Sequence, residues 1–285
     1  MADRRKRAPA VPRRRSATKP MAASPKLTRA RRLQPAMPLL TVDVGNSETT
    51  VGRFLGAELD GFWRLTSGRN TADELRLTLD ALLRSSASGW ASVVCSVVPG
   101  LTPAWSEALR AVTGRTPLEV NARNARLKID VPDPASVGAD RIANAYGAKR
   151  LYGSPAIVVD LGTATTFDCV SRGGAYVGGA IAPGMVTASE ELFRRAARLA
   201  RVDLRRPERA LGRTTEECLR IGVLWGNAGL VDALVRRIRN ELGGRPKVIA
   251  TGGLASVLAP ECETVDLVDE GLTLKGMRLL WEDLR

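Results

Sequence analysis

Two short segments with nearly the same pattern constrain the fold of this chain more than any other feature. The segments TVDVGNSETTVG, at 41–52, and IVVDLGTATTFDCV, at 157–170, each carry an apolar run that closes on an aspartate, with a glycine two places later. A polar turn follows in both, and a second β-type run then resumes. This pattern is typical of a hairpin with an aspartate, Asp43 or Asp160, at the end of its first strand. Its recurrence predicts two related halves.

The order of the other elements supports this interpretation. In each half the apolar periodicity predicts three consecutive strands and then helices, which is typical of a duplicated α/β fold with a ligand cleft between its halves. In the first half, strands are expected at 39–43, 49–55, 61–66, 91–99 and 118–120, and helices at 72–84, 103–113 and 139–151. In the second half, strands are expected at 156–160, 165–171, 175–181, 247–251 and 264–267, and helices at 185–199, 215–242 and 272–284, with a short helix after Gly252-Gly253.

The net charge of +13 comes mainly from the N-terminal segment. Residues 1–36 hold 12 Lys or Arg and one acid, Asp3, so the rest of the chain has 31 basic and 29 acidic residues. The segment has many prolines and no hydrophobic period, so we expect a disordered basic leader. It could bind nucleic acid or an anionic membrane, serve as a transit peptide, or lie upstream of a natural start at Met37. We expect an N-terminal half at 37–136 and a C-terminal half at 137–285.

The chemistry open to the chain is restricted because it contains no histidine. Ser-His-Asp hydrolysis, Cys-His proteolysis and His-ligated zinc are excluded, so acid–base work falls to Asp, Glu, Lys or Tyr. The four cysteines, which we expect to be buried thiols, form no CxxC pair, which indicates a reducing cytoplasm. No apolar run approaches the roughly 20 residues of a membrane span, so we expect no membrane crossing.

The two hairpin turns have the residues of a phosphate-binding site. Turns rich in Gly, Asn, Ser and Thr direct backbone N–H groups and hydroxyls to one point, and such a nest binds phosphate oxygens. An aspartate at the adjoining strand end can hold a metal ion directly or through water. The segment VIATGGLAS, at 248–256, adds a buried strand that runs through Gly252-Gly253 into a helix start, where an anionic ligand can approach the backbone. Each feature alone is better explained as an ordinary turn; together they predict a nucleotide site.

Seven segments in this order resemble one known family. They are DVGNS, SVVP, VGADRIANA, VVDLGTATTFD, GGAIAPG, RAARL and VIATGGLA. The chain is similar from Leu39 to its C-terminus to the type III pantothenate kinases of bacteria, within the acetate and sugar kinase/actin superfamily. The resemblance implies a duplicated ribonuclease-H-like fold, a homodimer, and ATP-dependent phosphorylation of pantothenate, the first step of coenzyme A synthesis.

The resemblance also implies roles for individual residues. Asp140 would accept the proton of the acceptor hydroxyl, and Asp160 would bind a monovalent cation, potassium or ammonium. Asp43 would help to hold Mg²⁺ with ATP. The ATP site would comprise Asp43, Val44, Gly45, Asn46, Ser47, Glu48, Thr49, Thr50 and Thr163. The pantothenate site would comprise Gly138, Ala139, Asp140, Arg141 and Thr215, with Arg141 suited to the pantothenate carboxylate through its fork of N–H donors.

Simpler interpretations stand beside these roles. Asp140 and Arg141 could be the polar first turn of a helix, where the dipole favours aspartate. Thr215 could be the first residue of a helix that Thr214 and Glu217 cap together. Asp168 is expected to be a surface or structural carboxylate rather than a ligand.

Two positions depart from the family pattern. Ser47 stands where the family usually has Thr, which keeps the hydroxyl. Val131 stands where many members have a Tyr that lines the pantothenate pocket from the partner subunit. The second departure leaves open a kinase for another small hydroxylated acceptor. A further alternative is an accessory transcriptional regulator of the same family, with nucleic acid contacted only through the basic leader.

Overall fold

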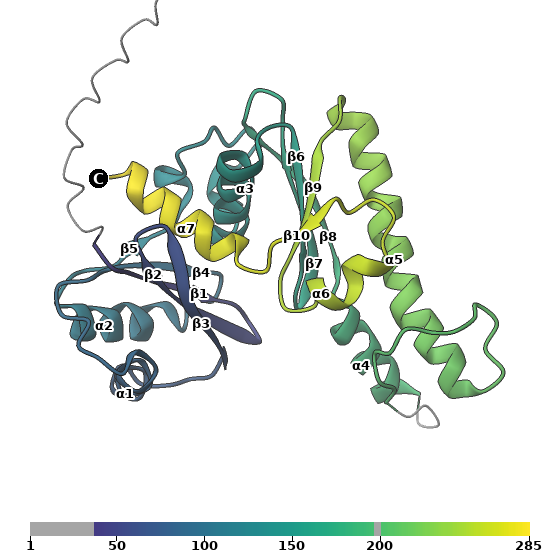
Figure 1. The fold of residues 1–285 in the computed structure, drawn as a ribbon, viewed down its shortest axis with the longest axis horizontal. Helices are drawn as coiled ribbons and strands as arrows, with labels where there is room; N and C mark the ends of the chain where they lie inside the picture. The colour runs from purple at the N-terminus through teal and green to yellow at the C-terminus, as the bar shows by residue number, and fades with distance from the viewer. Residues whose placement is uncertain (1–36, 197–200) are drawn as a thin grey trace, which may run out of the picture. The chain divides into compact units, whose positions relative to one another are not determined.

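The chain contains two five-stranded sheets, one from each half (Figure 1). The structure is a computed structural model, and it describes residues 37–196 and 201–285. The first sheet has the order β3-β2-β1-β4-β5, with β1 Leu39–Val44, β2 Glu48–Leu55, β3 Glu58–Thr66, β4 Ala91–Ser96 and β5 Leu118–Glu119. The second has the order β10-β9-β6-β7-β8, with β6 Ala156–Leu161, β7 Ala164–Val170, β8 Tyr176–Pro183, β9 Lys247–Thr251 and β10 Leu267–Val268.

The two sheets have the same topology. In each, the central strand, β1 or β6, pairs antiparallel with the next strand in the chain and parallel with a later one, β4 or β9. Asp43 thus lies between Thr50 and Cys95, and Asp160 between Thr166 and Thr251. This confirms the duplicated ribonuclease-H-like fold.

The helices form layers around the sheets (Figure 1). They are α1 Ala72–Leu83, α2 Thr102–Thr113, α3 Ala139–Tyr152, α4 Met185–Arg195, α5 Thr215–Leu242, α6 Ala255–Leu258 and α7 Leu272–Asp283, with short 3₁₀ turns at Ala122–Asn124, Pro134–Ser136 and Ala259–Glu261. Helices α1 and α2 cover one face of the first sheet, and α5 covers the outer face of the second. Helices α3 and α7 fill the space between the sheets and share apolar clusters with both.

The sequence accounts for these layers. Strands β1 and β6 are covered on both faces, and each reads as a nearly continuous apolar run that ends at its aspartate. Helix α1 begins at the predicted capping box, in which Glu74 N–H donates to Thr71 Oγ1 and Thr71 N–H donates to Glu74 Oε2 at 2.7 Å. Its buried residues Leu75, Leu79 and Leu83 follow at helical spacing.

The crossing of α3 and α7 depends on two glycines. A Cβ on Gly147 of α3 would lie 3.2 Å from the Cα of Gly276, and a Cβ on Gly276 of α7 would overlap the carbonyl oxygen of Ala143. The two helix backbones are therefore in direct contact, which brings the first turn of α3 close to both sheets. The predicted division at residue 136 stays a prediction, because α3 contacts both sheets.

Several expectations need correction at the element ends. The strand expected at 264–267 begins only at Leu267, because the amides of Glu263 and Thr264 bind the Asp232 carboxylate of α5 instead of a neighbouring strand. Thr214 caps α5, but Glu217 returns its carboxylate to the amide of Arg213 rather than to Thr214, so the capping box is incomplete. The end of the helix expected at 185–199, and the leader at 1–36, lie outside the described residues.

Two expectations from composition also change. The four cysteines are free thiols, but only Cys95 and Cys169 are buried, whereas Cys218 is exposed and Cys262 is half-buried. Helix α5 has the length and apolar composition of a membrane span, with a mean hydropathy of 1.4 over 18 residues, so the expectation that no run is long enough was wrong. Core helices pass the same test, and α5 packs Val231 and Val235 against the second sheet.

We predict that Gly276→Ala lowers the free energy of unfolding by about 2–3 kcal/mol, because the added methyl forces α7 away from the Ala143 carbonyl. Gly100→Ala is the matched control: a Cβ there meets nothing within 4 Å, so its effect should stay within about 0.5 kcal/mol. Urea denaturation of both variants is the measurement. Equal stabilities would contradict the proposed close contact.

Candidate active site

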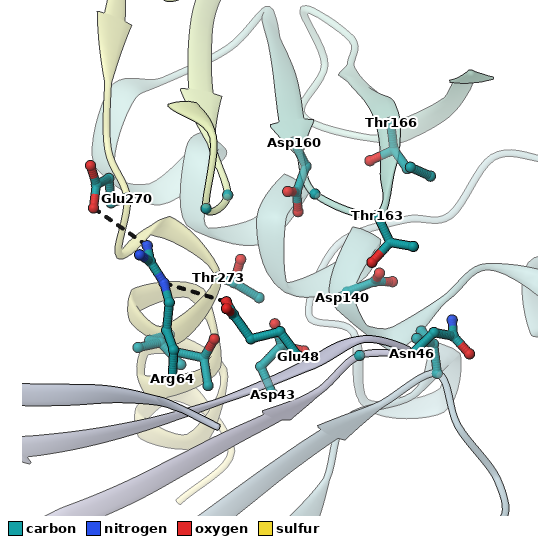
Figure 2. Close-up of a pocket in the computed structure, with 18 of the residues that line it drawn as sticks. Asp43, Asn46, Glu48, Arg64, Asp140, Asp160, Thr163, Thr166, Glu270 and Thr273 are labelled. Atoms are coloured by element: carbon teal, nitrogen blue, oxygen red, sulfur yellow. Dashed lines mark hydrogen bonds and ion pairs between the residues drawn. The ribbon is translucent and has the colours of Figure 1, made fainter. Parts of the chain in front are cut away.

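One cavity of about 240 Å³ lies between the two sheets, and both hairpin turns line it. Asp43 and Asp160 reach it from the ends of β1 and β6, and Asp140 reaches it from the first turn of α3 (Figure 2). Asn46 and Thr163 come from the two hairpin turns, and Gly252 and Gly253 come from the turn after β9. The duplicated segments therefore face a common space.

Each hairpin turn is closed by a backbone hydrogen bond from its glycine, although the bond spans one residue more in the first turn than in the second. In the first, the amide of Gly45 donates to the carbonyl of Glu48 at 3.0 Å; in the second, the amide of Gly162 donates to the carbonyl of Ala164 at 3.0 Å. A Cβ on Gly45 would lie 2.7 Å from the Glu48 carbonyl oxygen, so a side chain would force the first turn open. Asn46 and Thr163, whose side chains can bind phosphate oxygens, come from these turns and line the cavity.

The turn after β9 approaches the second aspartate closely. Gly252 has φ +89°, a conformation that favours glycine, and a Cβ there would overlap the Asp160 carboxylate. Two separate reasons therefore require glycine at this position: the backbone angle, and the lack of space for a side chain. The predicted role of Gly252-Gly253 in bringing a backbone close to the ligand is consistent with this contact.

The three aspartates are electrostatically coupled. Burial, followed by repulsion from Asp140 and Asp160, holds the pKa of Asp43 well above its usual value. Burial also raises the pKa of Asp160, to about 6, although the Asn144 amide partly opposes the shift. The pKa of Asp140 is raised by burial as well, despite a 2.7 Å hydrogen bond from the Arg141 amide to its Oδ1. A carboxylate with a raised pKa is a better proton acceptor.

A side-chain relay connects α3 to Asp160 and was not anticipated from the sequence. Asn144, one turn after Asp140 and fully buried, donates from Nδ2 to Asp160 Oδ2 at 2.9 Å. Thr273 at the start of α7 in turn donates to Asn144 Oδ1 at 2.8 Å. The i, i+4 spacing of Asp140 and Asn144 was a usable signal, because it places both on one face of the helix.

Arg141 is already engaged inside the protein. Its Nε donates to Asp168 Oδ1 at 2.6 Å and its Nη2 to the carbonyl of Phe167 at 3.0 Å, and its guanidinium lies over the Tyr176 ring. Asp168 is fully buried in β7, so it is a structural carboxylate and not a surface one. Val131 packs against the apolar cluster that includes Tyr176, with Cγ1 3.9 Å from the position of a Cβ on Gly178.

The structure brings some of the predicted residues into the cavity and leaves others outside. The cavity is lined by Asp43, Gly45, Asn46, Glu48, Thr50, Asp140, Asp160 and Thr163. Val44, Ser47, Thr49, Gly138, Ala139, Arg141 and Thr215 do not line it. Gly138 caps α3 and Ala139 is buried beside it. Thr215 lies at the exposed start of α5.

Other lining residues were missed. Phe62 and Arg64 of β3, and Glu270 just before α7, contribute to the wall (Figure 2). Arg64 lies opposite Thr50 in the β2–β3 register, so it shares a sheet face with the first hairpin turn. Alternation along β3 could have indicated which residues face together, but not that this face borders the cavity.

The donors present fit hard cations. The aspartates supply oxygen ligands, and their mutual repulsion would be relieved by positive charge. Within residues 37–196 and 201–285, no three Asp, Glu or Cys side chains are close enough to form a complete metal site on their own. This arrangement suits a cation whose coordination is completed by phosphate oxygens.

The fold and the cavity together define a duplicated ribonuclease-H-like architecture with a cavity between its two sheets. Among solved structures, the chain is similar to a conserved protein of the Baf transcriptional activator family from Campylobacter jejuni, with TM-score 0.54, 21% identity and coverage of 86% of this chain and 98% of the other. It is also similar to the ethanolamine utilization protein EutJ from Carboxydothermus hydrogenoformans, with TM-score 0.50, 14% identity and coverage of 87% and 91%. At these identities the likeness concerns the fold alone.

Sequence comparison then gives the family. The model of type III pantothenate kinase matches residues 39–237. The chain is 44% identical to the type III pantothenate kinase of Moorella thermoacetica, covering 86% of this chain and 98% of the relative. It is 46% identical to that of Thermomicrobium roseum, covering 86% and 96%. The chain belongs to the type III pantothenate kinase family.

We predict that Asp168 makes stability depend on pH. Burial raises its pKa from 3.8 to about 7, and its Oδ2 is buried without a hydrogen-bond partner. The folded state therefore retains a proton that the unfolded chain has lost, and the stabilisation is lost as pH rises through about 7.

The measurement compares the wild type with Asp168→Asn in urea denaturation at pH values from about 5 to 8. The difference in unfolding free energy should shift against the wild type by up to about 1.4 kcal/mol per pH unit below pH 7, and level off above it. A difference that is constant over this range would mean that Asp168 stays ionised.

Proposed function

We infer that this chain transfers the γ-phosphoryl group of ATP to the hydroxyl of pantothenate, the first step of coenzyme A synthesis. The observation that carries the proposal is the meeting of Asp43, Asp140 and Asp160 in one cavity between duplicated sheets, in a chain of this family. ATP and a divalent cation are the co-substrates that such a kinase uses. A location in the cytoplasm is part of the proposal.

The hairpin turns supply the phosphate site. The loop from Asp43 to Thr50 would hold the triphosphate from one side, and Thr163 would hold it from the other. Asp43 would help to hold Mg²⁺ and Asp160 would hold a monovalent cation, potassium or ammonium. When bound, these cations supply the charge neutralisation on which phosphoryl transfer depends.

Asp140 is assigned as the proton acceptor. The pantothenate hydroxyl oxygen forms a bond to the γ-phosphorus, while the bond from that phosphorus to the β–γ bridging oxygen breaks and ADP departs. The hydroxyl proton passes to the Asp140 carboxylate. Its raised pKa suits this task, and its place in the first turn of α3, held by the α3–α7 contact, fixes it between the two hairpin turns.

The acceptor site would lie at the start of α3. Gly138 and Ala139 would present backbone there, and Arg141 would bind the pantothenate carboxylate. The Arg141 role requires its remaining N–H groups, because Nε and Nη2 already bind Asp168 and Phe167. Thr215 does not line the cavity, so its proposed contact with pantothenate would come from the second subunit of a homodimer.

Helix α5 supports the homodimer proposal. Gly222, Gly226 and Gly229 lie close together along it, and a Cβ on any of them would meet nothing within 4 Å. A row of glycines open to the surroundings allows another helix to approach closely. Only a third of the most apolar window of α5 is buried within the chain.

We predict that Asp140→Asn lowers kcat at least about 100-fold with ATP, Mg²⁺, potassium and pantothenate, because the amide cannot accept the proton. ATP binding should persist. Asp73→Asn is the control, since Asp73 is also an acid in the first turn of a helix, α1, but lies outside the cavity. Phosphopantothenate formation is the readout. Near-normal turnover by Asp140→Asn would remove the base assignment.

The same assay tests the monovalent cation. Turnover should fall when potassium is replaced by a large organic cation, and Asp160→Asn should lose the potassium response. An unchanged rate without potassium or ammonium would end this part of the proposal.

We predict that Gly226→Leu converts the homodimer to a monomer, because the side chain would occupy the space that a partner helix needs. Light scattering after size exclusion is the measurement. Arg76→Leu, at an exposed position of a different helix, α1, is the control and should remain dimeric. A monomeric wild type would refute the homodimer directly.

The regulator alternative is not favoured by the family relatives, which are named as kinases. Removing residues 1–36 would still distinguish the regulator function from the kinase function. DNA binding carried by the leader should vanish, while kinase turnover should remain. Competition by pantothenate analogues addresses the other acceptors that Val131 leaves open.

A further inference from the structure

Charge in the cavity is strongly unbalanced. Five carboxylates line it: Asp43, Glu48, Asp140, Asp160 and Glu270. Arg64 is the one cationic side chain among the described residues that line the cavity. A triphosphate carries several negative charges, and a single divalent ion does not neutralise them all. The ligand of this site therefore needs the Arg64 guanidinium more than any other group in the wall.

Arg64 is positioned beside the first hairpin turn. It lies opposite Thr50 in the antiparallel register of β2 and β3, and its Nε is 3.4 Å from Oε1 of Glu48, which lies two pairs further along on the same face. Its guanidinium lies 5.5 Å from the centroid of the Phe62 ring, which shares its face of β3. Both Glu48 and Thr50 belong to the loop assigned to the triphosphate, so the guanidinium of Arg64 lies directly beside that loop.

Arg64 also reaches the other half of the chain. Its Nη2 is 3.5 Å from Glu270 Oε2, just before α7, and Glu48 Oε1 lies 3.9 Å from the position of a Cβ on Gly253 (Figure 2). Both ion pairs are long, and the side chains of Arg64, Glu48 and Glu270 are 35%, 49% and 37% exposed. Exposed pairs of this kind contribute little to stability, so the guanidinium can leave them for a better anion.

We propose that Arg64 binds the triphosphate of ATP, exchanging its loose pairs with Glu48 and Glu270 for a forked contact with phosphate oxygens. The inference rests on the proposed kinase function. A planar guanidinium can donate to two phosphate oxygens at once. Its present pairs with Glu48 and Glu270, at 3.4 and 3.5 Å, do not use this forked geometry. Figure 2 places Arg64 beside Glu48 and Glu270 and Asp140 beside Asn46 and Thr163, so Arg64 lies apart from the proposed base and would approach the triphosphate from the Glu48 end of the loop.

The test measures nucleotide binding without pantothenate, by calorimetry with Mg²⁺ and either adenylyl imidodiphosphate or AMP. Arg64→Ala should weaken binding of the triphosphate analogue by about 10- to 100-fold and change AMP binding by about twofold or less. Arg64→Lys, which keeps the charge and loses the fork, should fall between the wild type and Arg64→Ala. Equal losses for both nucleotides, or no loss for the analogue, would overturn the proposal.

The chain offers a matched control. Arg53 of the same hairpin also pairs with a carboxylate, Asp60, and lies 5.6 Å from an aromatic centroid, that of Trp63, but does not line the cavity. Arg53→Ala should leave the affinity for both nucleotides within about twofold of the wild type. If Arg53→Ala lost as much affinity for the analogue as Arg64→Ala, the effect of Arg64→Ala would come from a change in the folded hairpin and not from a lost contact with phosphate.

Glu270→Gln separates ligand binding from a structural bridge. If Glu270 competes with the triphosphate for Arg64, the amide should tighten binding of the analogue by about two- to fivefold. If the pair only joins the two halves, Glu270→Gln should weaken binding as Arg64→Ala does, and the proposal fails. A wild type that binds the analogue but does not phosphorylate pantothenate would overturn the acceptor assignment and leave the Arg64 result intact.

Discussion

The direct contact between the backbones of α3 and α7 is the constraint on which the rest of the structure depends. Gly147 and Gly276 let the two helices meet without intervening side chains, and the pair then fits between the sheets. Asp140 and Asn144 lie on α3, so this contact sets the position of the proposed base and of the amide that holds Asp160. The packing of these two helices thus determines where the proposed base lies in the cavity.

The cavity brings together carboxylates whose burial and proximity destabilise the folded protein. Burial raises the pKa values of Asp43, Asp140 and Asp160, repulsion from neighbouring carboxylates adds to the shift at Asp43 and Asp160, and each shift opposes folding at neutral pH. Such a cluster is tolerated where a ligand brings compensating charge. The cost in stability would be the counterpart of the binding of cation-loaded triphosphate that we propose for this cavity.

Much of the fold could be predicted from the sequence, because the duplicated hairpins and the helical period of Leu75, Leu79 and Leu83 are local signals. The convergence of Asp43, Asp160 and Asp140 followed from the recurrence and from the family resemblance. Arg64 could not be found in this way, because its role depends on which face of β3 borders the second half. The predicted start of β10 was wrong for a similar reason. The carboxylate of Asp232, distant in sequence, accepts hydrogen bonds from the amides that would otherwise pair with a neighbouring strand.

The equivalent strands differ in what surrounds their aspartates. Asp43 has the thiol of Cys95 beside it on β4, whereas Asp160 has Thr251 on β9 and receives the Asn144 amide. These neighbours lie beside the aspartates and not in the cavity lining, so the internal symmetry of the frame does not extend to how its two carboxylates are held.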